Sequence, residues 1–272
     1  MQVGKKLRLG RIFGFESNRT VIVAMDHGLF MGPVKGLESP SSVAKKAVDG
    51  GADALIVSPG MVRHIGNEVR GKTGLIIRVD GAVTAHGADF FRTRKLASVE
   101  DALRLGGDAI IAMGYVGTPT ESEGLENLGM FSRECEKFGV PLVAEMIPVQ
   151  SEKIKDPYDV DVVGLAARIG AEMGADVIKT HYTGTEQTFR QVVQGCPLPI
   201  VVAGGPKMKT EEQLLKVVRG ALNAGAVGVA FGRNIWQHRD PLGITRMIVE
   251  VVHGKSGTRK VKRNKERQKL SS

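Results

Sequence analysis

The chain repeats one unit, in which a short apolar segment is followed by a polar turn and then by an amphipathic stretch. Eight apolar segments of this kind occur among the 272 residues, over 20–25, 54–57, 75–79, 109–113, 142–146, 177–179, 200–203 and 227–231. Segments that are apolar on both faces are typical of parallel strands, because helices cover such sheets. The sequence therefore predicts an α/β fold with a parallel sheet.

A local phrase introduces several of these segments and narrows the choice of architecture. Glycine ends the preceding helix and an acidic residue often leads into the strand. The phrase occurs as Gly51-Ala52-Asp53, Gly107-Asp108, Gly174-Ala175-Asp176 and Gly225-Ala226. Eight strand-then-helix units favour a closed (β/α)8 TIM barrel over an open doubly wound sheet. The pattern GxGxxG does not follow the first strand, which argues against dinucleotide binding.

One barrel accounts for most of the length, and we divide the chain into three parts. Residues 1–18 are basic and contain several glycines, and we expect them to cap the bottom of the barrel. Residues 19–253 form the barrel itself, as a single domain. Residues 254–272 contain eight basic side chains and one acidic side chain, so this tail carries +7 of the net charge of +9. Its polar composition predicts disorder.

Composition indicates a cytoplasmic protein and argues against several classes. No apolar run approaches the ~20 residues of a membrane span, and the N-terminus lacks the apolar segment of a secretory signal. The two cysteines, Cys135 and Cys196, fit neither a disulfide framework nor a clustered zinc site. Because the excess positive charge lies in the tail, we do not expect the folded body to bind nucleic acid. Binding through the tail is an alternative.

Polar side chains gather at the C-terminal ends of the predicted strands, where the reacting groups of such barrels lie. In strand order they are Asp26, His27, Arg78, Asp80, Tyr115, Glu145, Met146, Lys179, His181, Lys207 and Arg233. A dense ring of this kind on an apolar scaffold predicts an active site at this end of the barrel.

Lys179 is the predicted nucleophile. It ends a buried strand, and lysine is rarely buried without a partner. Burial and neighbouring cations lower the pKa of an amine, which can then attack a ketone to form an iminium. Asp26, across the barrel mouth on the first strand, is the candidate acid/base for the proton transfers. The structural alternative is a buried salt bridge between Asp26 and Lys179.

Glycine-rich turns follow the seventh and eighth strands and predict a phosphate site. Gly204-Gly205 and Gly232 let backbone amides approach an anion, and the loops after these two strands are the usual phosphate site of the barrel. Lys207 and Arg233 add positive charge, and we assign His27 to substrate binding as well. The alternative is that these glycines simply turn the chain.

A metal site is a competing interpretation. Asp26, His27, Glu145 and His181 have suitable ligand atoms, but their spacing matches no compact ligand motif. A catalytic metal needs four suitably placed ligands. We therefore predict a metal-independent enzyme and keep metal-dependent chemistry as the alternative.

Several of these segments together resemble the DhnA/DeoC-type class I aldolase family. They are Asp26-His27-Gly28, Ile178-Lys179-Thr180, Ala203-Gly204-Gly205 and 231–237, and the resemblance runs over 21–253. It implies a (β/α)8 barrel, a Schiff base on Lys179, Asp26 as acid/base and sugar-phosphate binding at Gly204, Gly205, Gly232 and Arg233. It also implies a homo-oligomer, often a decamer of stacked pentamers, and no cofactor.

The resemblance leaves the substrate open. Fructose-bisphosphate aldolases and aminodideoxyheptulosonate synthases of the family place a tyrosine proton donor at the end of strand five, and the resemblance assigns this position to Met146. Tyr115 or Tyr182 are candidate replacements. We expect an aldolase-type lyase acting on a phosphorylated ketone or sugar phosphate. The alternatives are a thiolase that passes an acetyl group from a phosphorylated diketone to coenzyme A, and a synthase-type transaldolase.

Overall fold

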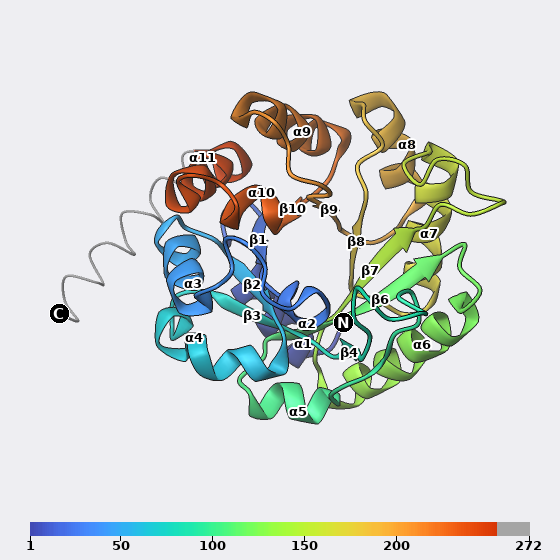
Figure 1. Cartoon of the computed structure of the whole chain (residues 1–272), viewed down its shortest axis with the longest axis horizontal. Coiled ribbons are helices and arrows are strands. Elements are labelled where there is room, and N and C mark those ends of the chain that lie inside the picture. The colour runs from blue at the N-terminus through green and yellow to red at the C-terminus, as the bar shows by residue number, and fades with distance from the viewer. Residues whose placement is uncertain (255–272) are drawn as a thin grey trace.

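The computed structural model describes residues 1–254, and eight parallel strands form a closed barrel at its centre (Figure 1). Their order around the barrel is β1-β10-β9-β8-β7-β6-β3-β2. The strands are β1 (Thr20–Ala24), β2 (Ala54–Val57), β3 (Gly74–Arg78), β6 (Ala109–Val116), β7 (Leu142–Pro148), β8 (Val177–Thr180), β9 (Ile200–Ala203) and β10 (Gly228–Phe231). The predicted (β/α)8 fold is confirmed.

Helices surround the barrel and alternate with the strands along the chain (Figure 1). The outer helices are α3 (Pro40–Asp49), α4 (Val62–Val69), α5 (Val99–Arg104), α6 (Glu121–Phe138), α7 (Val160–Glu172), α8 (Glu186–Gly195), α9 (Glu211–Ala224) and α11 (Pro241–His253). The shorter elements are α1 (Val3–Ile12), α2 (Gly28–Met31), η1 (Pro59–Met61), α10 (Arg233–Trp236) and the two-stranded pair β4 (Asp80–Gly81) and β5 (Arg94–Lys95). None of the helices within residues 1–254 is long and apolar enough to cross a membrane.

Two apolar layers explain why the strands are apolar along most of their length. Side chains alternate along a strand, so each strand contributes to both faces of the sheet. One set fills the barrel interior, with Ile22, Ile56 and Ile76 among its members. The other packs between the sheet and the helices. Both faces therefore exclude water, as in other (β/α)8 barrels.

The recurring acidic residue ties each strand to the strand before it. Asp53 accepts a hydrogen bond from the backbone N–H of Val21 at 2.7 Å, and Asp176 accepts one from Leu142 at 2.9 Å. Asp108 does the same for Leu75 at 3.0 Å. These carboxylates satisfy backbone donors at the ends of the strands, which gives the repeated phrase a structural reason.

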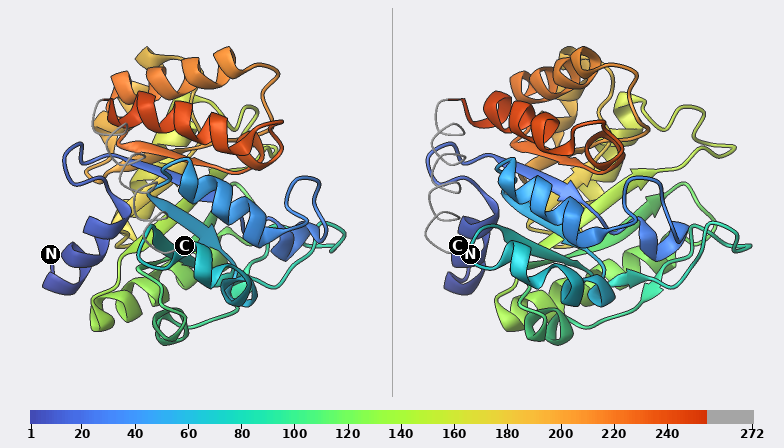
Figure 2. Two further views of the ribbon diagram at one scale, coloured as in Figure 1. Left: turned by 90° about the vertical axis from the view of Figure 1, so that its left-hand side faces the viewer. Right: turned by 60° about the vertical axis from the view of Figure 1, so that its left-hand side comes forward.

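Helix α1 lies at the end of the barrel where the strands begin, and the loops that follow the strands lie at the opposite end (Figure 2). Ile12 of α1 joins the interior cluster, and its carbonyl accepts a hydrogen bond from Thr20. Lys5 pairs with Asp176 at 3.0 Å. The N-terminal segment thus contacts the floor of the barrel, leaving the other end open for chemistry. The predicted tail lies outside the described residues, apart from Gly254.

Candidate active site

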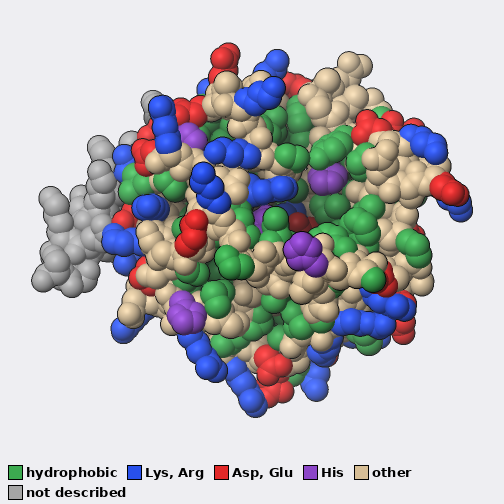
Figure 3. Space-filling model, in the orientation of Figure 1, with side chains coloured by type: hydrophobic (Ala, Val, Ile, Leu, Met, Phe, Trp, Pro, Cys, Tyr) green, Lys and Arg blue, Asp and Glu red, His purple; other side chains and the backbone are tan. Residues whose placement is uncertain are grey.

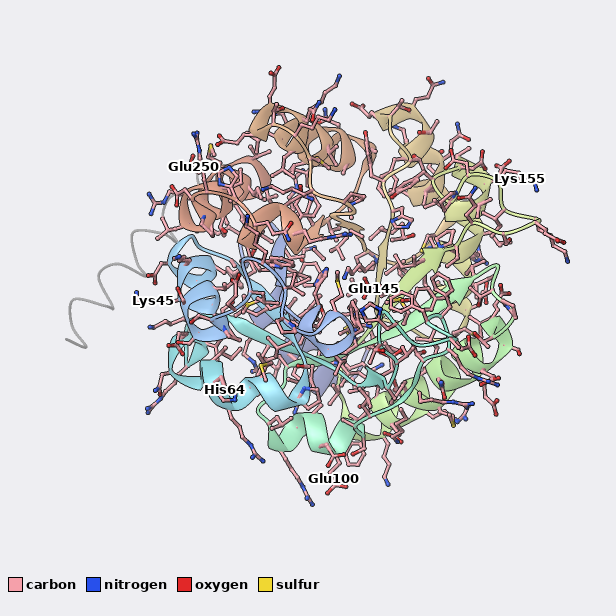
Figure 4. The ribbon with its side chains drawn as sticks, in the orientation of Figure 1. Lys45, His64, Glu100, Glu145, Lys155 and Glu250 are labelled. Atoms are coloured by element: carbon pink, nitrogen blue, oxygen red, sulfur yellow. The ribbon has the colours of Figure 1, made fainter. Side chains whose placement is uncertain are left out.

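Lys179 lies on the inward face of β8, at the end of the barrel where the strands finish. Its register partner on β7 is Glu145, and its ammonium nitrogen Nζ lies 2.5 Å from Glu145 Oε1. The lysine is 4% exposed and the glutamate 8%. Figure 4 places Glu145 at the centre of the barrel, whereas Lys45 and Lys155 lie at the periphery. A buried lysine facing a carboxylate is therefore present where the sequence predicted a nucleophile.

Arg78, at the end of β3, connects the carboxylates of this site. Its Nε donates to Asp26 Oδ2 at 2.9 Å, its Nη1 donates to Asp80 Oδ1 at 3.2 Å, and its Nη2 donates to Glu145 Oε2. All four side chains are buried. Buried charges are stable only when they are paired and hydrogen-bonded, and the planar guanidinium satisfies three carboxylates at once.

The alternative of a direct salt bridge between Asp26 and Lys179 is wrong, because Arg78 and Glu145 connect the two side chains. Asp26 pairs with Arg78, Arg78 pairs with Glu145, and Glu145 pairs with Lys179. The strand order explains the difference, because β9 and β10 separate β8 from β1 in the barrel. Asp26 and Lys179 still belong to one cluster of charges, as the sequence predicted.

The charges in this cluster keep two carboxylates ionised. Burial raises the pKa of Asp26, but attraction to Arg78, with smaller contributions from His27 and Lys179, outweighs it and holds that pKa well below its usual range. The pKa of Glu145 is also lowered, because Lys179 and Arg78 outweigh burial. Asp26 is thus a weak base in the resting site. It is suited to accept a hydrogen bond from a substrate hydroxyl and to take the proton only as a bond breaks.

Tyr115 is the predicted phenol that faces this cluster. It lies on β6 opposite Ile147 of β7, and its ring packs edge-on against Phe91 at 5.1 Å. Burial and then the negative charge of Glu145 raise the pKa of Tyr115, so the phenol stays protonated at neutral pH. Tyr182 instead packs against Phe189 of α8 at 5.2 Å, in the helical layer. Of the two candidate replacements, only Tyr115 lies near the charged cluster.

Met146, where we placed the missing tyrosine position, does not face the charged cluster. Met146 is fully buried among the residues that pack between sheet and helices, against Gly114 of β6 and Gly170 of α7. Because side chains alternate along β7 and Glu145 faces the interior, Met146 faces the shell. The next inward position is Ile147, which carries no proton to transfer. Neither Met146 nor Ile147 can therefore supply the proton that the family tyrosine supplies.

The glycine turn after β10 lies beside His27. A Cβ atom added to Gly232 would lie 2.6 Å from His27 Cε1 and 2.9 Å from the carbonyl oxygen of Ala24, so no side chain fits there. The His27 ring packs edge-on against Trp236 at 5.3 Å. Its Nδ1 lies 3.6 Å from Asp26 Oδ1, which is beyond hydrogen-bonding distance. His27 thus lies between the acid/base candidate and the glycine turn.

The side chain of Asn234 holds the turn after β9 through hydrogen bonds. Its side-chain amide donates to the carbonyls of Gly204 and Pro206 at 2.8 and 3.1 Å, and its oxygen accepts from the backbone N–H of Met208. Gly205 adopts φ +61°, a conformation that favours glycine. Three hydrogen bonds of the Asn234 side chain therefore hold this turn, and Asn234 is not among the predicted site residues.

Arg233 and Lys207, the two cations predicted to bind phosphate, differ in their hydrogen bonding. Among the described residues, the Arg233 Nε is buried without a hydrogen-bond partner. Lys207 is exposed, and its Nζ donates to the carbonyl of Gln237 at 2.6 Å. Figure 3 shows Lys and Arg side chains gathered on the α10 and β10 side of the central opening. This side of the mouth is the one that favours an anion.

Tyr158 and His181, which follows β8 two residues after Lys179, pack against each other. The two rings stack with centroids 4.6 Å apart. A Cβ atom at Gly205 would lie 3.8 Å from the Tyr158 hydroxyl, so this phenol approaches the glycine turn. Burial lowers the pKa of His181, and its Nδ1 is buried without a partner among the described residues. Sequence reasoning missed Tyr158 because it lies in the long loop between β7 and α7, away from any strand end.

The described residues contain no group of three or more His, Cys, Asp or Glu side chains that could hold a metal ion. Of the four predicted ligands, Asp26 and Glu145 are engaged by Arg78 and Lys179. The metal-dependent alternative therefore finds no ligand set in this part of the chain.

Comparison with characterised sequences identifies relatives over nearly the whole chain. The model of the DeoC/LacD family aldolases matches residues 20–238. A 2-amino-3,7-dideoxy-D-threo-hept-6-ulosonate synthase of Archaeoglobus fulgidus is 38% identical, with 93% of this chain and 92% of that protein covered. A class 1 fructose-bisphosphate aldolase of Thermoproteus tenax is 36% identical, with 90% and 93% covered. Neither is a thiolase, and the thiolase alternative finds no support in these comparisons.

A solved structure shows the chemistry of one relative directly. An archaeal fructose-1,6-bisphosphate aldolase, with its catalytic lysine covalently bound to the carbinolamine intermediate of the substrate, superposes with a TM-score of 0.84. It is 34% identical, and the match covers 92% of this chain and all of that chain. The predicted family, fold and enzyme class are confirmed, and the chain belongs to the DeoC/LacD family of class I, Schiff-base-forming aldolases.

Proposed function

We propose that Lys179 forms a Schiff base with a phosphorylated ketone or sugar phosphate, and that the enzyme makes or breaks a carbon–carbon bond through that intermediate. The observation that carries this proposal is the position of the Lys179 amine, which is buried at a strand end, 2.5 Å from the carboxylate of Glu145. The barrel mouth is the usual location of catalysis in this architecture.

The Schiff base activates the substrate for cleavage. Attack of the Lys179 amine on the ketone and loss of water leave an iminium, whose positive charge accepts the electrons of the bond that breaks. Asp26 takes the proton of the hydroxyl that becomes the aldehyde product. Tyr115, which stays protonated beside the cluster, then gives a proton to the enamine carbon. Asp26 is thus the base and Tyr115 the acid, and both residues face the mouth of the barrel.

The phosphate of the substrate binds on the side of β9 and β10 in this proposal. Gly204, Gly205 and Gly232 offer backbone that no Cβ atom shields, and Arg233 has a buried nitrogen available. His27 lies between this region and Asp26 and contacts the substrate from there. Lys207 contributes charge from the rim after it leaves Gln237.

Two aldol reactions are supported by the relatives. The T. tenax protein is a fructose-bisphosphate aldolase and the A. fulgidus protein is a heptulosonate synthase. We place fructose-bisphosphate-type cleavage first and synthase-type transaldolase chemistry second. A substrate panel with fructose 1,6-bisphosphate, a heptulosonate precursor mixture and a phosphorylated diketone with coenzyme A separates them.

The proposal is tested by Lys179→Met. We expect borohydride to inactivate the wild-type enzyme only when a panel substrate is present, and we expect the variant to lack activity on every panel substrate. Lys45→Met is the matched control, because Lys45 is exposed and pairs with Asp49, one turn along α3. Activity that survives in Lys179→Met would end the proposal.

A further inference from the structure

The carboxylate of Glu145 contacts both Lys179 and Arg78. Its two carboxylate oxygens have different partners, since Oε1 faces Lys179 Nζ at 2.5 Å while Oε2 accepts from Arg78. It lies on the inward face of β7 and is 8% exposed. The contact with Arg78 fixes the carboxylate, so that the other oxygen is held against the reacting nitrogen.

The amine needs such a partner for a chemical reason. A protonated lysine has no lone pair with which to attack a carbonyl carbon, so a proton must leave before the bond forms. Among residues 1–254, the carboxylate in ion-pair contact with Lys179 is that of Glu145. Asp26 and Asp80 are held by other parts of the Arg78 guanidinium. The path for the proton therefore leads to Glu145.

We propose that Glu145 is the catalytic residue that carries protons to and from the Lys179 nitrogen during Schiff-base formation. This inference rests on the proposed function and assigns one step of it. Glu145 takes a proton from the Lys179 ammonium, and the neutral amine adds to the ketone carbon. The C–N bond forms and the C=O π bond breaks, and a proton passes from nitrogen to oxygen to give the neutral carbinolamine. The Glu145 carboxylic acid then protonates the carbinolamine hydroxyl, which leaves as water.

The atoms and protons of these reaction steps balance without any further reactant. The ammonium supplies three protons, of which two leave in the water and one stays on the iminium nitrogen. Glu145 ends as the carboxylate with which it began. The resulting iminium cation faces the same carboxylate oxygen that faced the ammonium, so the ion pair that stabilises the resting enzyme also stabilises the intermediate.

The experiment measures how fast dihydroxyacetone phosphate and borohydride label Lys179, by intact-protein mass spectrometry over time. General acid–base groups contribute about 10²- to 10⁴-fold to a step, so we expect Glu145→Gln to slow labelling by about 100-fold. Sodium formate should accelerate labelling in Glu145→Ala, because it supplies the missing carboxylate. Glu250→Gln, an exposed position on α11, is the matched control and should label at the wild-type rate.

The outcomes separate this inference from the function on which it rests. Labelling of Glu145→Gln at the wild-type rate overturns the role of Glu145 but leaves the proposed Schiff base on Lys179 intact. If formate does not accelerate the labelling of Glu145→Ala, the role of Glu145 is overturned in the same way. A wild-type enzyme that is labelled neither with dihydroxyacetone phosphate nor with any panel substrate overturns the proposed function itself. If circular dichroism shows that Glu145→Gln is unfolded, Glu145→Asp keeps the negative charge with a shorter reach. It should label about tenfold more slowly, given the sensitivity of proton transfer to distance.

Discussion

Removing Arg78 tests whether the carboxylates of the mouth are held together by one cation. The Arg78 side chain is 3% exposed and pairs with Asp26, Asp80 and Glu145. Breaking a buried ion pair by removing one partner costs about 3–5 kcal/mol, because the remaining charge stays buried. Arg78→Met should therefore lower the free energy of unfolding by about that amount. For a chain of this size, the melting temperature should fall by about 6–20 °C.

The loss should depend on pH, and the sign follows from the direction of the pKa shifts. The pKa of Asp26 is lowered in the folded enzyme, so its ionised form stabilises the fold above the unfolded pKa near 4. Without Arg78, burial raises that pKa above the unfolded value, and the charged form then destabilises the fold. The variant should consequently recover part of its deficit as the pH falls from about 7 to about 4.5, where Asp26 takes up a proton.

Thermal unfolding by circular dichroism at these two pH values measures both effects. Arg104→Met is the matched control, because Arg104 pairs with Glu100 at 2.8 Å on the surface and its side chain is 74% exposed. Exposed pairs contribute about 0–1 kcal/mol, so the control should melt within a few degrees of the wild type at both pH values. A deficit for Arg78→Met that equals the control, or that does not change with pH, would refute the reasoning.

Three further substitutions test the site. Tyr115→Phe should lower turnover by about 100-fold while Tyr182→Phe leaves it near the wild-type value, in steady-state assays on the active panel substrate; equal effects would remove the phenol from proton transfer. Gly232→Ala should raise KM for the phosphorylated substrate and cost about 1–3 kcal/mol by overpacking, since its Cβ would overlap His27. Gly60→Ala, which meets nothing within 4 Å, should change neither quantity. Asp26→Asn should lower turnover by about 10²-fold or more yet still give the borohydride adduct; unchanged turnover would exclude Asp26 from proton transfer.

The strands could be predicted because both of their faces are buried. No polar residue interrupts segments such as 54–57, and most of the strands end at a glycine or a charged residue. Helix α4 was not predicted, although Val62, Ile65 and Val69 form its buried face. Gly60 and Gly66 beside this pattern weaken the helical signal. The long segment after β3 contains the antiparallel strands β4 and β5. Each of them has two residues, which is too short for an alternating apolar and polar pattern to be recognised.

The members of the site could be predicted more readily than their pairing. The rule that reacting groups lie at strand ends identified Lys179, Asp26, Arg78 and Glu145. Which cation meets which carboxylate depends on the order and stagger of strands around the barrel, and these do not follow from local sequence. Local sequence also does not determine whether a side chain near a strand end points into the barrel or toward the helices. For this reason Met146 was expected at the site, whereas it packs between the sheet and the helices.

The most direct test of the account is peptide mapping of the borohydride-reduced adduct. The wild-type enzyme is reduced in the presence of its active panel substrate, digested with protease and sequenced by tandem mass spectrometry. We predict a covalent adduct on the peptide that contains Lys179 and none on the peptides of Lys45 or Lys207. An adduct on another lysine, or turnover of the substrate with no lysine modified, would contradict the central claim.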